Sequence, residues 1–116
     1  ALELARSGAD LKGTISFHGG LNTPTPKDAS NIKGEVLALH GADDPYVPLK
    51  EVEDFEKEMR DAKVKWELVK YGNAVHSFTI KEAGNDHSKG AAYNAEADQK
   101  SWEAMKTFFS RIFAKK

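Results

Sequence analysis

Hydrophobic residues along the chain fall into three short runs that predict β-strands. These runs are Leu11–Phe17, Glu35–His40 and Lys65–Tyr71. The second is almost continuously apolar and lies between Gly34 and Gly41, a pattern typical of a parallel strand that is buried on both faces. In the third run the side chains alternate, with Trp66, Leu68 and Lys70 on one set of positions and Glu67, Val69 and Tyr71 on the other, which predicts another strand.

Hydrophobic residues elsewhere recur every three or four positions and predict helices. A short Ala/Leu-rich helix at the start ends near Gly8, where glycine is a common helix terminator. A second helix follows Pro48 and carries Val52, Phe55 and Met59 on one face, and charges around Glu51–Lys63 are expected to form its solvated face. The longest helix is predicted at Ala95–Phe113, with a stripe expected to pack in the core: Trp102, Met105, Phe108, Phe109 and Ile112.

The order of these elements predicts an α/β fold of about three parallel strands with flanking helices. Two polar segments rich in turn-forming residues, Leu21–Lys33 and Gly72–Asn94, are predicted loops. A sheet of three parallel strands has edges that a larger sheet would pair. We therefore expect the chain to be part of a larger α/β domain.

Composition limits the kinds of protein to consider. The 116 residues, 40% hydrophobic and 30% charged, suit one domain. The net charge of −1 argues against a nucleic-acid partner. No apolar run approaches the roughly 20 residues that a membrane-spanning helix needs. The cytoplasm is the default expectation for localisation, and the absence of cysteine excludes disulfides and thiolate metal sites.

The candidate chemistry lies in the loops that follow the predicted strands. Parallel α/β sheets place their sites at the carboxyl ends of strands, so Asp44, His76 and the segment Phe17–Gly20 can meet there. An Asp that binds one imidazole nitrogen leaves the other free to accept a proton from a nucleophile. No such nucleophile is evident, because cysteine is absent and no serine lies in a G-x-S-x-G turn. The expectation is a nucleophile upstream of Ala1, because the first residues resemble the end of a helix and the acid and histidine follow the nucleophile in hydrolases of this architecture.

Several segments together resemble the dienelactone hydrolase family of the α/β-hydrolase fold. They are ALELA, TISFHGGL, LHGADDPYVP, YGNAVHSFT and AGNDHSKGAAYNAEADQKSWEAMKTFF. The resemblance implies that residues 1–116 are the C-terminal part of a single α/β-hydrolase domain, with Asp44 as the triad acid and His76 as the base. It implies a Cys or Ser nucleophile shortly before Ala1 and hydrolysis of esters or lactones through an acyl-enzyme.

The resemblance also bears on the substrate. Enzymes of this family that act on dienelactone carry an Arg four residues after the catalytic His to bind the substrate carboxylate, and this chain has Ile80 there. A different small-molecule ester or lactone is therefore implied. His18 occupies the position of a pocket-lining residue of the family and is a candidate substrate contact.

Structural interpretations of the same residues remain open. Asp43, Asp44 and Pro45 could form a turn whose carboxylates cap backbone amides, and His76 could be an ordinary loop histidine. The histidines lack the short spacing of metal ligands, and Gly19-Gly20 lacks the pattern of a phosphate-binding loop. Neither a metal nor a cofactor is expected.

Three functional hypotheses follow. The first is the acid and base half of an ester or lactone hydrolase, inactive alone. The alternative is a non-catalytic α/β half-domain that associates with itself or pairs with a separate N-terminal half. A flavodoxin-like nucleotide binder fits the alternation of elements but lacks the phosphate loop.

Overall fold

A three-stranded parallel sheet forms the centre of the chain. The computed structural model describes residues 1–114. The sheet order is β1 (Gly13–Phe17), β2 (Glu35–Gly41), β3 (Trp66–Tyr71). The helices are α1 (Leu2–Arg6), α2 (Leu49–Asp61) and α3 (Ala95–Ala114), and the 3-10 turns are η1 (Pro26–Asn31), η2 (Lys81–Ala83) and η3 (His87–Lys89). The predicted α/β fold of three parallel strands with flanking helices is confirmed.

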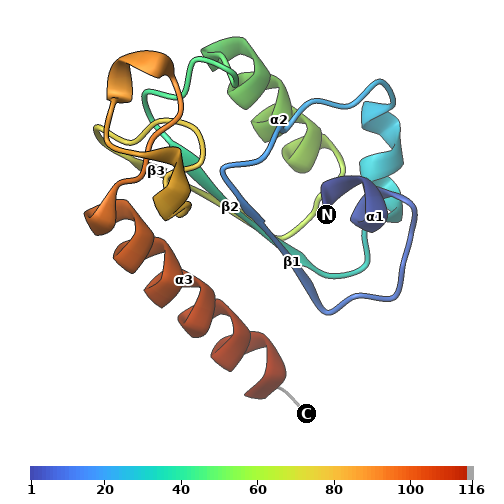
Figure 1. Cartoon of the computed structure of the whole chain (residues 1–116). Helices are drawn as coiled ribbons and strands as arrows, with labels where there is room; N and C mark the ends of the chain where they lie inside the picture. The colour runs from blue at the N-terminus through green and yellow to red at the C-terminus, as the bar shows by residue number, and fades with distance from the viewer. Residues whose placement is uncertain (115–116) are drawn as a thin grey trace.

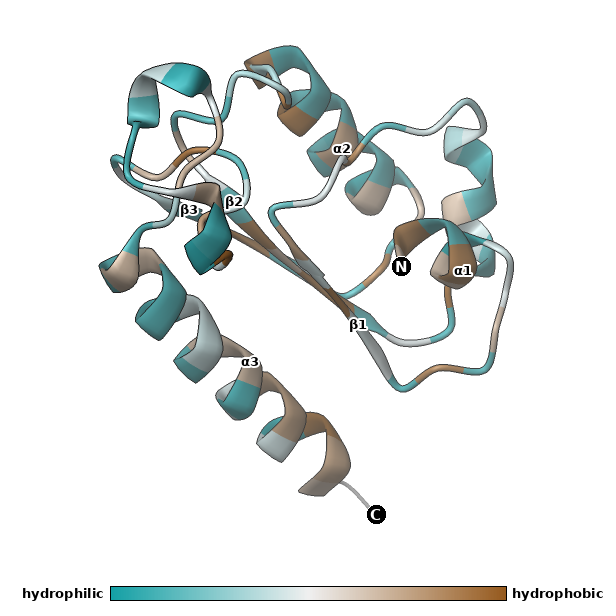
Figure 2. Cartoon of the chain, in the orientation of Figure 1, coloured by the Kyte–Doolittle hydropathy of each residue, from teal (hydrophilic) through white to brown (hydrophobic). Residues whose placement is uncertain are grey.

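Helices cover both faces of the sheet (Figure 1): α1 and α2 lie on one side and α3 lies on the other. Side chains on β2 alternate between these layers. Val36 and Ala38 pack in a core with α2, whereas Leu37 and Leu39 pack with α3. All four are 1% exposed, so β2 is buried on both faces, as its continuous apolar run predicts. In Figure 2 the hydrophobic residues of the strands lie in the layer between the helices.

Helix α2 presents its predicted apolar face to the sheet. Val52, Phe55 and Met59 are at most 1% exposed, and each contributes about 1.5–3 kcal/mol by burial. The prediction of a solvated opposite face is wrong at Glu58, which is 6% exposed. Its carboxylate is buried because Arg6 lies against it, a partner that the local charge pattern does not reveal.

The expected core stripe of α3 is only partly buried. Phe108 and Ile112 are 4% and 5% exposed, but Trp102 and Phe109 are 54% and 37% exposed. The five apolar positions cover more of the helix circumference than a single sheet contact can bury. The prediction of core packing is therefore wrong for Trp102 and Phe109. No helix among residues 1–114 is long and apolar enough to cross a membrane.

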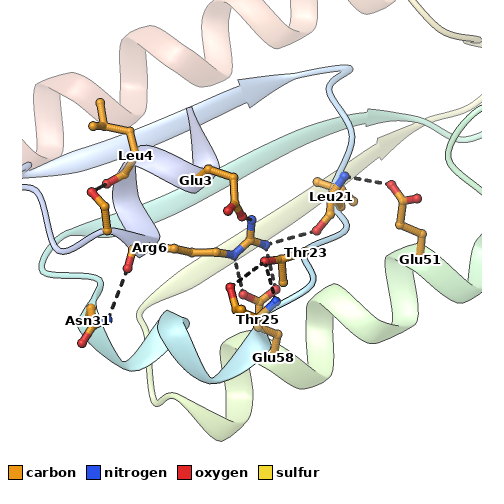
Figure 3. A network of polar contacts seen from close by, with 10 residues as sticks. Glu3, Leu4, Arg6, Leu21, Thr23, Thr25, Asn31, Glu51 and Glu58 are labelled. Atoms are coloured by element: carbon orange, nitrogen blue, oxygen red, sulfur yellow. Dashed lines mark hydrogen bonds and ion pairs between the residues drawn. The ribbon is translucent and has the colours of Figure 1, made fainter.

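A buried ion pair connects α1 to α2 (Figure 3). Nε of Arg6 donates to Glu58 at 2.6 Å and Nη2 donates to its other carboxylate oxygen at 2.8 Å. Nη2 also donates to the carbonyl of Leu21 at 3.1 Å, and the amide of Leu21 donates to Glu51 at 2.8 Å. Both backbone polar groups of Leu21 are thus held by charged side chains, which fixes the loop that follows β1.

Candidate active site

The carboxyl ends of the three strands bring together the residues that the sequence singled out. His18 directly follows β1, Asp44 lies in the turn after β2, and His76 lies in the loop after β3. The amide of Asp43 donates to the carbonyl of Ala74, which joins the turn after β2 to the loop after β3, and the amide of His18 donates to the carbonyl of Leu39 in β2. Gly41 permits this contact, because a Cβ there would lie 2.7 Å from a backbone oxygen of the loop after β3.

Asp44 and His76 form a hydrogen-bonded pair. Nδ1 of His76 lies 2.8 Å from Oδ2 of Asp44, whose side chain is fully buried. The other carboxylate oxygen accepts the amide of Tyr46 at 2.8 Å. Asp44 therefore caps a backbone amide and orients the histidine at once, so the two interpretations of this residue are compatible.

The other nitrogen of His76 is available. With Nδ1 donating to Asp44, Nε2 carries the lone pair. The side chain is 31% exposed, and within residues 1–114 no hydrogen bond to Nε2 is present. This is the arrangement that a general base requires.

The backbone of His76 is fixed by the loop that contains η3. Its amide donates to Gly90 at 3.1 Å, and its carbonyl accepts the amide of Ala92 at 3.0 Å. The next residue, Ser77, has a φ of 60°, an uncommon left-handed conformation for a residue other than glycine. The chain therefore turns sharply immediately after the histidine.

Two aromatic rings meet the imidazole of His76 edge-on. The ring of Tyr46 lies 5.3 Å away and that of His18 lies 5.7 Å away, measured between centroids. Tyr46 is 60% exposed, so this side of the site is open in the described chain. Tyr46 was not singled out from the sequence, although its place two residues after Asp44 is a signal that could have identified it.

His18 is held by contacts of its own. Its backbone has a φ of 43°, and its Nε2 lies 2.8 Å from Oγ1 of Thr79. Burial lowers the pKa of His18, and a positive charge on the neighbouring His76 would lower it further, so the ring is neutral near pH 7. Thr79 was also missed from the sequence, where only its position three residues after His76 could have drawn attention.

The remaining histidines do not join this cluster. His87 lies in η3 and is exposed. His40 is 5% exposed, burial lowers its pKa, and its Nδ1 has no hydrogen-bond partner among residues 1–114. Within that range no group of three or more His, Cys, Asp or Glu side chains is placed to hold a metal ion.

The chain is similar to known proteins along most of its length. A family model described as the dienelactone hydrolase family matches residues 1–113. A solved structure called m3DLH is 43% identical, with a TM-score of 0.90 over 97% of this chain and 47% of that one. The dienelactone hydrolase-like promiscuous phosphotriesterase P91 from metagenomic libraries is 44% identical, with a TM-score of 0.86 over 96% of this chain and 46% of that one.

A curated relative agrees with this family. A protein of Saccharolobus solfataricus, provisionally named carboxymethylenebutenolidase, is 35% identical over 103 residues, which cover 88% of this chain and 36% of the relative. The chain thus spans about half of the two solved structures and about a third of this relative. On the family match and the agreement in fold, the chain belongs to the dienelactone hydrolase family.

Proposed function

We propose that residues 1–116 form the C-terminal part of an α/β-hydrolase domain that cleaves carboxylic esters or lactones, with Asp44 as the acid and His76 as the base. The observation that carries this proposal is the 2.8 Å hydrogen bond between the buried Asp44 carboxylate and Nδ1 of His76, which leaves Nε2 available. Family membership supports the class of reaction.

In this proposal each side chain has one task. Asp44 keeps the proton of His76 on Nδ1 and stabilises the imidazolium that forms when Nε2 accepts a second proton. That proton comes from a Cys or Ser nucleophile outside these residues, which attacks the substrate carbonyl. His76 then protonates the departing alcohol, and an acyl-enzyme remains. In the second half of the cycle, Nε2 takes a proton from water, the water attacks the acyl group, and the nucleophile recovers its proton.

The residues around the pair favour a substrate without a carboxylate. Ile80 is 43% exposed and stands where the family resemblance places the carboxylate-binding Arg. The neighbouring His18 is neutral near pH 7 because burial lowers its pKa, so it does not supply the missing positive charge. We propose that His18 lines the pocket and contacts the substrate through its ring.

A chimera tests the assignment of the acid. Residues 1–116 replace the segment of P91 that they match, and hydrolysis of p-nitrophenyl butyrate is measured. Asp44→Asn is expected to lower kcat roughly 10⁴-fold, because the amide no longer holds His76 in the correct tautomer. Asp43→Asn is the matched control, since Asp43 is exposed and only its backbone amide joins the site. Equal activity of the two variants would remove Asp44 from the mechanism.

A specific asymmetry supports the second candidate function, assembly with another half-domain. The flank of α3 on the β3 side is polar, with Lys100, Glu103 and Arg111 near Glu67. The flank on the β1 side is apolar, and Phe113, which is 59% exposed, lies there against Lys12. Among the described residues β1 pairs only with β2.

This asymmetry favours continuation of the sheet beyond β1, by a strand and a helix from a separate N-terminal half or from a second copy. Size-exclusion chromatography with light scattering tests association with a second copy, for which we expect a concentration-dependent dimer. A monomer that also fails to bind an N-terminal half would remove this candidate.

A further inference from the structure

Thr79 makes a polar contact with His18 that has no role in the proposed reaction. Its Oγ1 lies 2.8 Å from Nε2 of His18, and both side chains are partly buried. The two residues come from opposite edges of the sheet, since His18 follows β1 and Thr79 follows β3. Their contact therefore spans the whole site above the end of β2.

The ring of His18 is restrained from several directions. It meets the buried ring of Phe78 edge-on with centroids 5.0 Å apart, and on another side it meets His76 at 5.7 Å. The loop that follows it is held at Leu21 by Arg6 and Glu51. A ring held this firmly restricts the neighbouring imidazole of His76 as well.

Which partner donates in the contact between His18 and Thr79 depends on the tautomer of His18. The scheme has the proton of the neutral ring on Nδ1, the tautomer whose Nε2 can accept a hydrogen bond from a hydroxyl. Nε2 then carries the lone pair and accepts the hydroxyl proton of Thr79. The hydrogen bond thereby satisfies Nε2 while the ring is uncharged.

An uncharged ring matters at this position. As a base His76 becomes positively charged, and a second positive charge on a ring 5.7 Å away would oppose that step. The Thr79 hydroxyl stabilises the neutral tautomer, since its proton occupies the lone pair that an additional proton would need.

We propose that Thr79 is a positioning residue: through the neutral ring of His18 it holds the imidazole of His76 in the orientation that leaves Nε2 open. The inference rests on the proposed role of His76 as the base. Thr79 itself touches neither substrate nor nucleophile in this scheme.

The test uses NMR of the 116-residue chain with ¹⁵N-labelled histidine, which reports the tautomer of each ring without any need for activity. In the unaltered chain His18 is expected to carry its proton on Nδ1. Thr79→Val is nearly isosteric and removes the hydroxyl, so we expect mixed tautomers of His18 and a broadened or lost Nδ1–H signal of His76. Thr79→Ser keeps the hydroxyl and is expected to restore both signals.

Thr107→Val provides the matched control, because Thr107 is exposed on α3, away from the site. The signals of buried His40 show whether each variant keeps its fold. A proton on Nε2 of His18 in the unaltered chain, or an unchanged His76 signal in Thr79→Val, would overturn the inference. If the unaltered chain gives no Nδ1–H signal of His76, the hydrogen bond from His76 to Asp44 does not form, and the proposed function would be overturned instead.

Discussion

Glu58→Gln removes the negative charge that neutralises the buried guanidinium of Arg6. The side chains of Arg6 and Glu58 are 2% and 3% exposed and share two hydrogen bonds, at 2.6 and 2.8 Å. Breaking such a pair from one side costs about 3–5 kcal/mol, because the remaining charge stays buried without compensation. Arg6 keeps the carboxylate of Glu3 and the carbonyl of Leu21 as partners, so we expect the lower end, about 3 kcal/mol.

Thermal unfolding followed by circular dichroism measures this loss. For a domain of this length, about 3 kcal/mol corresponds to a Tm lower by roughly 10–15 °C. Lys57→Ala is the control on the same helix: it breaks the Lys57–Asp61 pair, whose side chains are 73% and 65% exposed. An exposed pair of this kind contributes about 1 kcal/mol at most.

The double variant Arg6→Met, Glu58→Met separates the charge effect from packing. It removes both charges and keeps apolar volume, so it should be more stable than Glu58→Gln alone. The reasoning about a buried pair would be refuted if Glu58→Gln lowered Tm no more than Lys57→Ala. It would also be refuted if the double variant were less stable than the single one.

Three further predictions concern pH, backbone packing and the exposed flank of α3. Burial lowers the pKa of His18 and His40 below their ordinary 6.5, so below that pH the unfolded chain binds more protons than the folded chain. Urea titrations should therefore show the free energy of unfolding falling as pH drops through 6.5. A constant free energy of unfolding from about pH 7 to 5 would contradict this. Gly41→Ala places a Cβ 2.7 Å from a backbone oxygen of the adjoining loop, so thermal melts should show a clear loss of stability, whereas an unchanged Tm would show that the loop can move. Trp102→Lys with Phe109→Lys should weaken any self-association seen by light scattering, and an unaffected dimer would place the interface elsewhere.

The sequence predicted the parts of the fold that depend on local pattern. The apolar run of β2 indicated a strand buried on both faces, and both faces are covered. The meeting of Asp44 and His76 was also predictable, because residues that follow adjacent parallel strands share one edge of the sheet.

Contacts between distant residues could not be predicted in the same way. Arg6 and Glu58 are 52 positions apart, and nothing in the charge pattern of α2 distinguishes Glu58 from its exposed neighbours. Thr79 likewise gives no local signal, because its importance depends on His18, which is 61 positions away. The exposure of Trp102 depends on which flank of α3 the sheet reaches, and periodicity alone does not specify that.

Ester hydrolysis by the isolated chain and by its chimera with P91 tests the central claim most directly, namely that this chain supplies the base but no nucleophile. With p-nitrophenyl butyrate we expect no turnover above buffer from the 116-residue chain. The chimera should turn over, and His76→Ala should reduce its kcat by a factor on the order of 10⁴ or more. Turnover by the isolated chain that disappears in His76→Ala would contradict the account. A folded, active chimera whose kcat is unchanged by His76→Ala would contradict it as well.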